Sequence, residues 1–343
     1  MVKLEIKTIK GHKYLYLRDK VKVNAKNVVI SFYVGRLGKI PQERFIYKLA
    51  KFEIFKLKTY TDYRLKKHRC AFLDKKRAFD LEVLGYGYQL FKELYPDEFK
   101  RYEQAFFVRY AQGTTAIEGN TITYRQAAEL LEHSTTPTGK SMREIYELLN
   151  FKDLGRFIDS YEGDISEKII KKIHAILMQN LLESVGAYRR IHVYIEKEEY
   201  VPPPPFEIPK LMKELIEWYR ANKRKLHPLE LAILLHTKVV TIHPFVDGNG
   251  RVGRALLNFV LKRNGYPTLY LGLEHREKYL DAVAEGNKEN YKPIIDFTNE
   301  IYLQQHNKIY DEIIKKVQNG KVEVYPDHGR LIKEFRKITE KEG

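Results

Sequence analysis

Residues 241–254 combine side chains whose types and spacing suit the binding and chemistry of a polyphosphate. They read TIHPFVDGNGRVGR. The segment brings together an imidazole, a carboxylate, an asparagine between two glycines and two guanidiniums: His243, Asp247, Gly248, Asn249, Gly250, Arg251 and Arg254. Because glycine has no Cβ, the backbone N–H groups of 248–250 can approach an anion closely. The segment therefore predicts a phosphate-binding loop.

The loop leads into a helix. Apolar residues recur at helical spacing over 252–260, and the run 264–267, which holds Asn, Gly and Pro, provides a stop. The loop thus ends on a helix N-terminus, where unpaired amides and the helix dipole favour negative charge. Arg251 and Arg254 are spaced one turn apart, so both guanidiniums can reach phosphate oxygens.

The two remaining groups of the loop, Asp247 and His243, are suited to binding a metal ion and to accepting a proton. Asp247 does not bind an anion directly, but a carboxylate can hold a divalent cation that bridges phosphates. His243 is then the candidate general base, because an unperturbed imidazole is mostly neutral near pH 7 and can accept a proton.

The segment resembles the signature of the Fic family, His-x-Phe-x-(Asp/Glu)-Gly-Asn-Gly-Arg-x-x-Arg. All eight specified positions are filled, by His243, Phe245, Asp247, Gly248, Asn249, Gly250, Arg251 and Arg254. The resemblance covers about residues 100–300 and is strongest from His227 to Pro267. It implies a mainly α fold, a Fic-type helical bundle that uses ATP and Mg²⁺.

The resemblance also implies a reaction, the transfer of AMP from ATP to a Ser, Thr or Tyr hydroxyl of a protein. In that reaction His243 takes the hydroxyl proton and Asp247 holds Mg²⁺ against the α- and β-phosphates. The loop backbone and the Asn249 side chain stabilise charge on the α-phosphate. Arg251 and Arg254 orient the β- and γ-phosphates, so that pyrophosphate is the leaving group.

A shorter resemblance lies upstream, in the segment 114–119. The inhibitory pattern of part of the family, (Ser/Thr)-x-x-x-Glu-(Gly/Asn), is matched by Thr114, Glu118 and Gly119. A Glu118 carboxylate paired with Arg254 would occupy the guanidinium that must hold a terminal phosphate, and would repel the nucleotide. We therefore expect autoinhibition by Glu118.

Three alternatives share these residues. A branch of the family binds the nucleotide reversed and phosphorylates its target, but its signature departs from the glycine-asparagine-glycine wording kept here. The same site could remove AMP from a modified protein, with Glu118 orienting a water, or work in both directions. The third alternative is a catalytically silent regulator that binds nucleic acid, favoured by the net charge of +16 and the basic strands near the start.

Two further segments are assigned from the resemblance. Residues 186–195 alternate branched and polar side chains before the prolines of 202–205, which suggests a short hairpin. A flap occupies this place in the resembling family and pairs with the segment to be modified, so Arg189 or His192 could tune target choice without a catalytic role. Asn290, beyond the signature helix, is a candidate for lining the nucleotide base pocket.

Hydrophobic periodicity indicates the elements that position these groups. Residues 1–40 read as a small N-terminal β-meander, and 41–112 as a helical region. We assign 113–300 to the Fic domain, where a helix over 228–242 delivers His243 and Thr123 with Gln126 forms a capping box. Residues 301–343 read as a charged helical tail.

Composition limits the class of protein. The chain has 343 residues and one cysteine, Cys70, which excludes an intramolecular disulfide framework. No apolar run is long enough for a membrane span, so we expect a cytoplasmic protein without membrane contact. The expected partners are a protein target with a modifiable hydroxyl and the protein itself, through auto-modification. A homodimer is left open, and nucleic acid is the less favoured partner because Lys and Glu are interleaved along most of the chain.

Overall fold

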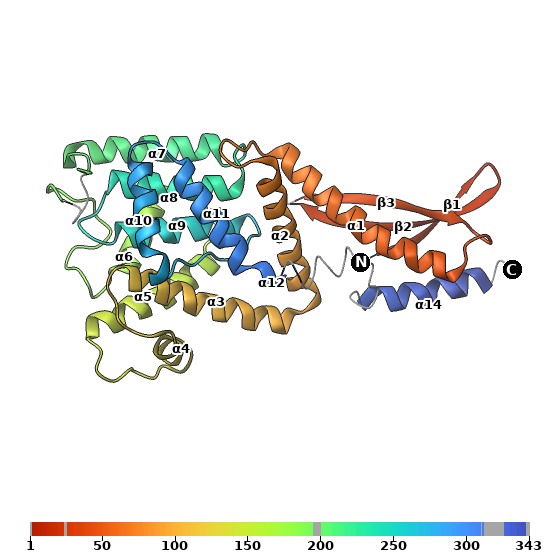
Figure 1. The fold of residues 1–343 in the computed structure, drawn as a ribbon, viewed down its shortest axis with the longest axis horizontal. Coiled ribbons are helices and arrows are strands. Elements are labelled where there is room, and N and C mark those ends of the chain that lie inside the picture. Colours follow the sequence, from red (N-terminus) through yellow and green to blue (C-terminus); the bar gives the residue numbers. More distant parts are fainter. Residues whose placement is uncertain (1, 24–25, 195–199, 310, 312–325, 341–343) are drawn as a thin grey trace. The chain divides into compact units, whose positions relative to one another are not determined.

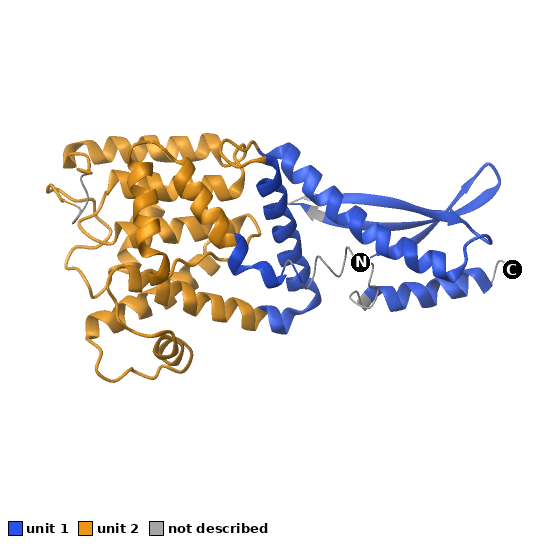
Figure 2. Cartoon of the chain, in the orientation of Figure 1, with its two compact units in different colours: residues 1–68, 75–99, 303–343 blue, residues 69–74, 100–302 orange. Residues whose placement is uncertain are grey.

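The computed structural model describes residues 2–23, 26–194, 200–309, 311 and 326–340. The chain divides into two compact units (Figure 2). Unit 1 comprises residues 1–68, 75–99 and 303–343, and unit 2 comprises 69–74 and 100–302. Within the described residues, no helix is both long and apolar enough to cross a membrane.

Unit 1 is built on a three-stranded antiparallel sheet in the order β1-β2-β3 (Figure 1). The strands are β1 (Lys3–Ile9), β2 (His12–Val23) and β3 (Lys26–Arg36). Lys10 and Gly11 connect the first two strands, and both have positive φ, as a two-residue hairpin turn requires. The predicted N-terminal meander is confirmed. In its second strand, Val21 and Val23 continue the buried alternation begun by Leu15 and Leu17.

Helices cover the apolar face of this sheet. The two covering helices are α1 (Gln42–Lys67) and α14 (Pro326–Glu340). A third helix, α2 (Lys75–Leu94), packs on α1. The Phe45 and Phe335 rings stack with centroids 4.1 Å apart and join α1 to α14. A fully buried ion pair joins α1 to α2, since Arg64 Nε lies 2.9 Å from Glu82 Oε2. The short α12 (Asn307–Ile309) also contacts α2.

Unit 2 is helical. Its helices are α3 (Pro96–Ile117), α4 (Tyr124–His133), α5 (Met142–Ser160), α6 (Glu167–Leu177), α7 (Ile208–Asn222), α8 (Pro228–Ile242), α9 (Asn249–Arg263), α10 (Arg276–Asn287) and α11 (Lys292–Gln305), with 3₁₀ turns at Pro205–Glu207 and Leu273–His275. The almost fully buried α8 and the adjacent α9 lie side by side in the centre of unit 2 (Figure 1). Helices α7 and α10 pack on α8, and α6 packs on α9.

Polar contacts fix the ends of these helices as the sequence indicates. The capping box predicted at Thr123 and Gln126 is present at the start of α4, and Ser141 with Glu144 forms a second one at α5. The buried carboxylate of Glu230 on α8 accepts three backbone N–H groups of the segment 71–73 at 2.7–2.8 Å. The position of α8, and of the residue that follows it, is therefore set by hydrogen bonds as well as by apolar packing.

The hairpin expected at 186–195 is not formed in the residues that the structure describes there. None of 186–194 or 200–204 is in a strand, and 195–199 lie outside the described residues. The buried Arg189 ties this segment together instead, because its guanidinium donates to the carbonyls of His243, Ile191 and Pro203 at 2.6–3.0 Å. These bonds hold the segment without the backbone hydrogen bonds of paired strands, to which the prolines of 202–205 cannot donate.

Candidate active site

His243 lies at the C-terminal end of α8, where the chain turns into the loop. Its backbone is left-handed, with φ of 50°, and its carbonyl accepts from Arg189 Nε at 2.8 Å. Its Nδ1 lies 3.2 Å from the Val240 carbonyl, which can only accept, so Nδ1 carries the proton. Nε2 is therefore the basic nitrogen of the neutral ring. Burial lowers the pKa of His243 despite the hydrogen bond to Val240, which favours this neutral form.

The loop between α8 and α9 is fixed by the side chain of Asn249. Its Oδ1 accepts from the Phe245 N–H and its Nδ2 donates to the Phe245 carbonyl, both at 2.9 Å. The expected contact of this amide with the α-phosphate is therefore not available while both bonds are made. Asn249 holds the loop closed, which leaves the backbone N–H groups at the start of α9 as the anion donors.

Two glycines of the loop are required by close approaches. Gly248 has φ of 82°, and a Cβ there would lie 2.6 Å from Met178 Sδ. A Cβ on Gly250 would lie 2.8 Å from Glu118 Oε1 and 3.0 Å from an Arg254 nitrogen. The Glu118 carboxylate thus lies directly over the N-terminal turn of α9, in the place where an anion would bind.

Arg254 holds that carboxylate. The buried guanidinium donates from one terminal nitrogen to Glu118 Oε1 at 2.5 Å and to the Thr114 carbonyl at 3.1 Å. Its Nε donates to Thr114 Oγ1 at 2.7 Å, and its other terminal nitrogen lies 3.3 Å from Tyr279 Oη. Burial works against the charge of Arg254, but Tyr279 and Glu118 offset it, and the pKa of Arg254 is raised. The Glu118 carboxylate and the Arg254 guanidinium, which the sequence analysis expected to pair, are thus in contact.

Asp247 and Arg251 belong to a second network on the same side of the loop. Asp247 Oδ1 accepts from Arg251 at 3.1 Å, and Arg251 also donates to Glu147 Oε1 at 3.2 Å. Glu147 Oε2 accepts from Asn120 Nδ2 at 2.8 Å, two residues after Glu118. Arg251 is 2% exposed, so in this state it orients Asp247 rather than reaching toward a phosphate.

A cavity of about 170 Å³ lies between these two networks. It is lined by the polar groups of both: Glu118, Gly119, Asn120, Arg143, Glu144, Glu147, Asp247 and Arg251. Its volume is below the roughly 300 Å³ at which small-molecule pockets begin. With the segment 114–119 in this position, the cavity is smaller than a whole nucleotide requires.

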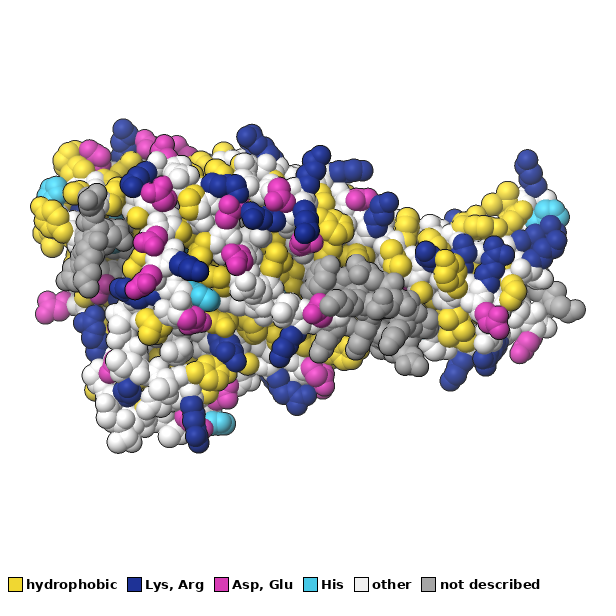
Figure 3. Space-filling model, viewed as in Figure 1, with side chains coloured by type: hydrophobic (Ala, Val, Ile, Leu, Met, Phe, Trp, Pro, Cys, Tyr) yellow, Lys and Arg dark blue, Asp and Glu magenta, His cyan; other side chains and the backbone are white. Residues whose placement is uncertain are grey.

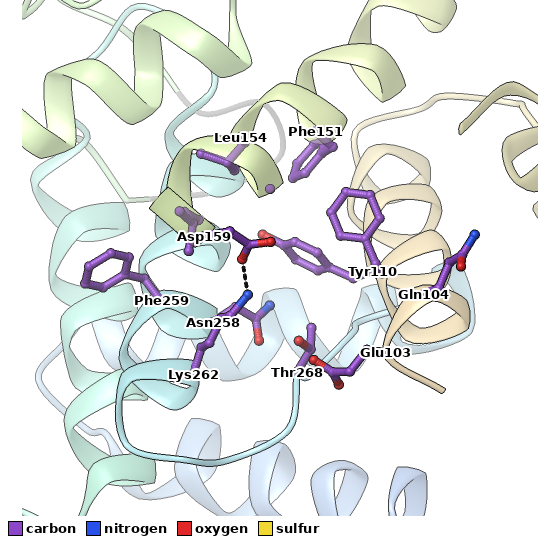
Figure 4. Close-up of a pocket in the computed structure, with 13 residues that line it drawn as sticks. Glu103, Gln104, Tyr110, Phe151, Leu154, Asp159, Asn258, Phe259, Lys262 and Thr268 are labelled. Atoms are coloured by element: carbon purple, nitrogen blue, oxygen red, sulfur yellow. Dashed lines mark hydrogen bonds and ion pairs between the residues drawn. The ribbon is translucent and has the colours of Figure 1, made fainter. Parts of the chain in front are cut away.

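A larger cavity, of about 250 Å³, lies between α3, α5 and α9 (Figure 4). Aromatic and apolar side chains such as Tyr110 and Phe151 line it, and a Lys262–Asp159 ion pair lies at its edge (Figure 4). None of the residues predicted for the phosphate site lines it. We therefore do not assign the nucleotide to this cavity.

Asn290 is not brought to the loop by its described contacts. It is exposed after α10, and its amide donates to Glu285 at 2.9 Å. Asn287, three residues earlier, instead contacts the last turn of α8, where its Oδ1 accepts from Thr241 Oγ1 at 2.8 Å. Its buried Nδ2 has no hydrogen-bond partner within the described part of the chain. The choice between the two asparagines depends on where α10 ends, and the sequence alone does not fix that end.

His174 on α6 is a site residue that sequence reasoning missed. Its Nε2 donates to the Asp247 carbonyl at 3.1 Å, and its Nδ1 accepts from the Gly186 N–H at 2.8 Å. The ring stacks on Phe245 with centroids 3.9 Å apart. A histidine on the apolar face of an amphipathic helix was the available signal, but that pattern does not reveal what the ring contacts.

Burial, together with the nearby charge of Arg251, lowers the pKa of His174 to about 4. The unfolded histidine binds its proton with a pKa near 6.5, so the contribution of His174 to stability is present above pH 6.5 and is lost as the pH falls toward 4. We expect a loss of roughly 3 kcal/mol over this range from this one group.

Urea unfolding at pH 7, 5.5 and 4.5 measures this loss. The His174→Gln variant should be less stable at pH 7 and should show a shallower decrease in unfolding free energy with acid. Parallel pH curves for the two proteins would exclude His174 as the source.

The fold and the site together define a class of protein, a helical bundle in which two central helices hold a Fic-type loop. The family model described as the Fic/DOC family matches residues 164–261, from the start of α6 into α9. The chain belongs to the Fic/DOC family.

Relatives of known name agree with this assignment. The chain is 32% identical to the protein adenylyltransferase Fic of Aedes aegypti over 258 residues, 71% of this chain and 50% of the relative. It is 33% identical to the protein of the same name from Nematostella vectensis over 202 residues, 57% of this chain and 46% of the relative. The chain thus spans about half the length of the curated relatives it matches.

Solved structures confirm the mainly helical Fic fold. A Fic domain containing signaling protein from Bacteroides thetaiotaomicron superposes with a TM-score of 0.62 at 28% identity, over 68% of this chain and 97% of that one. A structure of Fic-1 from C. elegans superposes with a TM-score of 0.58 at 26% identity, over 67% and 70% of the two chains.

Proposed function

We propose that this protein transfers AMP from ATP to a hydroxyl of a protein, and that the structure is its autoinhibited state. The observation that carries the proposal is the contact of Glu118 with Arg254 over the start of α9, next to a histidine whose free nitrogen is basic. The names of the relatives, protein adenylyltransferase, support the same reaction. We assign it to the segment 113–300, which contains the family match.

Each group has a role in this proposal. His243 accepts the proton of the attacking hydroxyl at Nε2, because its Nδ1 is committed to Val240. The backbone N–H groups at the start of α9 stabilise negative charge on the α-phosphate that is attacked. Arg254 holds the terminal phosphates once Glu118 has left it, and pyrophosphate departs.

The residues present fit a magnesium ion. Asp247 offers one partly exposed carboxylate, and Mg²⁺ in nucleotide sites is held by one or two carboxylates together with the substrate phosphates. When bound, the ion would neutralise charge on the phosphates. The part of this chain in that arrangement is to orient the carboxylate, through Arg251 and the Gly248 N–H.

The proposal is tested with ATP labelled at either the α- or the γ-phosphate. The protein is incubated with each nucleotide and Mg²⁺, alone and with a cell extract as a source of target, as wild type and as Glu118→Gly. We expect label from the α-position on protein, and γ-label only in released pyrophosphate. Retention of the γ-label would mean phosphorylation, and no retained label in either form would contradict AMP transfer.

A second reaction mixture separates addition from removal. Protein labelled by the Glu118→Gly form is isolated and incubated with wild type without ATP. Release of labelled AMP by wild type, but not by His243→Ala, would assign AMP removal to the same site and make the enzyme a two-way one.

A further inference from the structure

The N-terminal sheet has one face that no described helix covers. Alternate residues of β2 point toward α1, whereas Tyr14, Tyr16, Arg18 and Lys20 point the other way. The register places Tyr33 of β3 opposite Tyr16, and Lys3, Glu5 and Lys7 of β1 on the same side. We call the residues of this side the open face: Lys3, Glu5, Lys7, Tyr14, Tyr16, Arg18, Lys20, Val29, Ser31, Tyr33 and Arg36.

The centre of the open face is aromatic. The Tyr33 ring lies between the other two tyrosines, with centroids 6.2 Å from Tyr14 and 5.5 Å from Tyr16. Tyr33 is 47% exposed and Val29, farther along the same strand, is 50% exposed. Tyrosines that only filled a core would be covered, so these rings are available for contact with a ligand.

The rest of the open face is basic. Five Lys and Arg side chains surround the tyrosines, against one carboxylate, Glu5, which is already paired with Arg18 at 2.9 Å and Lys7 at 3.5 Å. Residues 1–40 contain ten Lys and Arg and two Asp and Glu, a net charge of +8, which is half of the +16 of the chain. Lys and Arg side chains gather around the strands of unit 1 in the space-filling view (Figure 3). The excess charge is thus concentrated on this module.

We propose that the open face binds a single-stranded nucleic acid. The exposed ring of Tyr33 on β3, beside the half-buried Tyr14 and Tyr16 on β2, offers a stacking platform to unpaired bases, and the surrounding cations match the phosphates. An acidic protein would use the cations but not an exposed aromatic cluster, and a duplex would hide its base faces from the rings. This inference does not depend on the AMP transfer proposed above.

The test measures binding of fluorescently labelled 20-nucleotide oligo(U), oligo(dT) and a duplex of equal length to the full-length protein by fluorescence anisotropy. We expect one or both single strands to bind more tightly than the duplex, and the preferred one identifies RNA or DNA as the ligand. Tyr33→Ala should weaken binding by roughly 5-fold to 100-fold, the loss of stacking for one base. Tyr33→Phe keeps the ring and should bind like wild type.

Two matched controls separate this surface from general effects. Tyr47→Ala removes a tyrosine on α1 that is somewhat more exposed than Tyr33, and should leave binding unchanged. The double variant Lys3→Gln, Lys20→Gln should reduce the slope of log K against log salt by roughly 0.7 for each cation removed. Lys213→Gln with Lys278→Gln, both on exposed positions of unit 2, should not change it.

The proposal is overturned if Tyr33→Ala binds as wild type does, or if the duplex binds as tightly as the single strands. Sedimentation with phosphatidylserine vesicles that depends on Tyr33 in the same way would assign the face to a lipid surface and overturn it too.

Discussion

Replacement of His243 by alanine is expected to lower the rate of AMP transfer by roughly 100-fold to 10,000-fold, the range that a positioned general base contributes. The imidazole is neutral, with Nε2 free to accept a proton because Nδ1 donates to Val240. Alanine removes this acceptor but none of the groups that hold phosphate. We therefore expect nucleotide binding to persist while transfer is lost. The initial rate of α-label transfer, measured in the Glu118→Gly background, gives the first quantity, and equilibrium dialysis with ATP gives the second.

The control for this substitution is His133→Ala, which removes an exposed histidine from the end of α4 and should not change the rate. The pH profile provides a second check. Because burial lowers the pKa of His243, the base stays deprotonated below pH 6.5, and the acid side of the rate profile should fall off below that pH. A transfer rate in His243→Ala within threefold of the parent would remove His243 from the mechanism.

Replacement of Glu118 by glycine is expected to raise the rate of AMP transfer by roughly 10-fold to 100-fold. The bond from Arg254 to the Glu118 carboxylate is charge-assisted, and such bonds contribute about 1.5–3 kcal/mol. A nucleotide must displace that carboxylate both from Arg254 and from the space over Gly250. Glycine removes both obstacles. The free energy of productive ATP binding should therefore become more favourable by about the contribution of the lost Glu118–Arg254 bond.

The Glu118→Gln variant separates the effect of the carboxylate charge from the effect of the side-chain volume on inhibition. The amide keeps the volume over Gly250 but loses the ion pair, so an intermediate rate is expected. Glu277→Gln, which removes an exposed carboxylate from α10, is the control for net charge. Equal transfer by wild type and both Glu118 variants, with all proteins folded by thermal unfolding, would mean that the contact seen here does not limit the reaction.

Local sequence rules predicted the framework of the site. The signature loop lies between two helices as its glycines and the flanking apolar spacing indicate, and the segment of Glu118 does contact Arg254. The loop and its flanking helices could be predicted because glycine positions and helix periodicity are properties of a short stretch of sequence, whereas the contact of Glu118 with Arg254, 136 residues away, was expected from the family pattern.

The sequence does not indicate which protein groups engage the side chains of the site in the structure. The Asn249 amide and the Arg251 guanidinium are both engaged by the protein, by Phe245 and by Glu147, and neither partner is implied by the motif. Asn287, the last residue of α10, contacts Thr241 on α8, whereas Asn290 lies beyond the end of that helix and bonds to Glu285. Alternation in 186–194 does not produce a strand in the described residues, where Arg189 donates to three carbonyls, and the rest of the predicted hairpin lies outside the described residues.

The hydrogen bonds from Asn120 through Glu147 and Arg251 to Asp247 have a consequence for regulation. Asn120 is two residues from Glu118, so a displacement of the inhibitory segment changes the support of the carboxylate proposed to hold the cation. Two equilibria that share a buried connection are thermodynamically linked, and linkage is reciprocal. A divalent cation that binds more tightly when the segment is displaced must therefore favour that displacement by the same factor, so such an ion would act as an effector of the proposed reaction as well as its proposed cofactor.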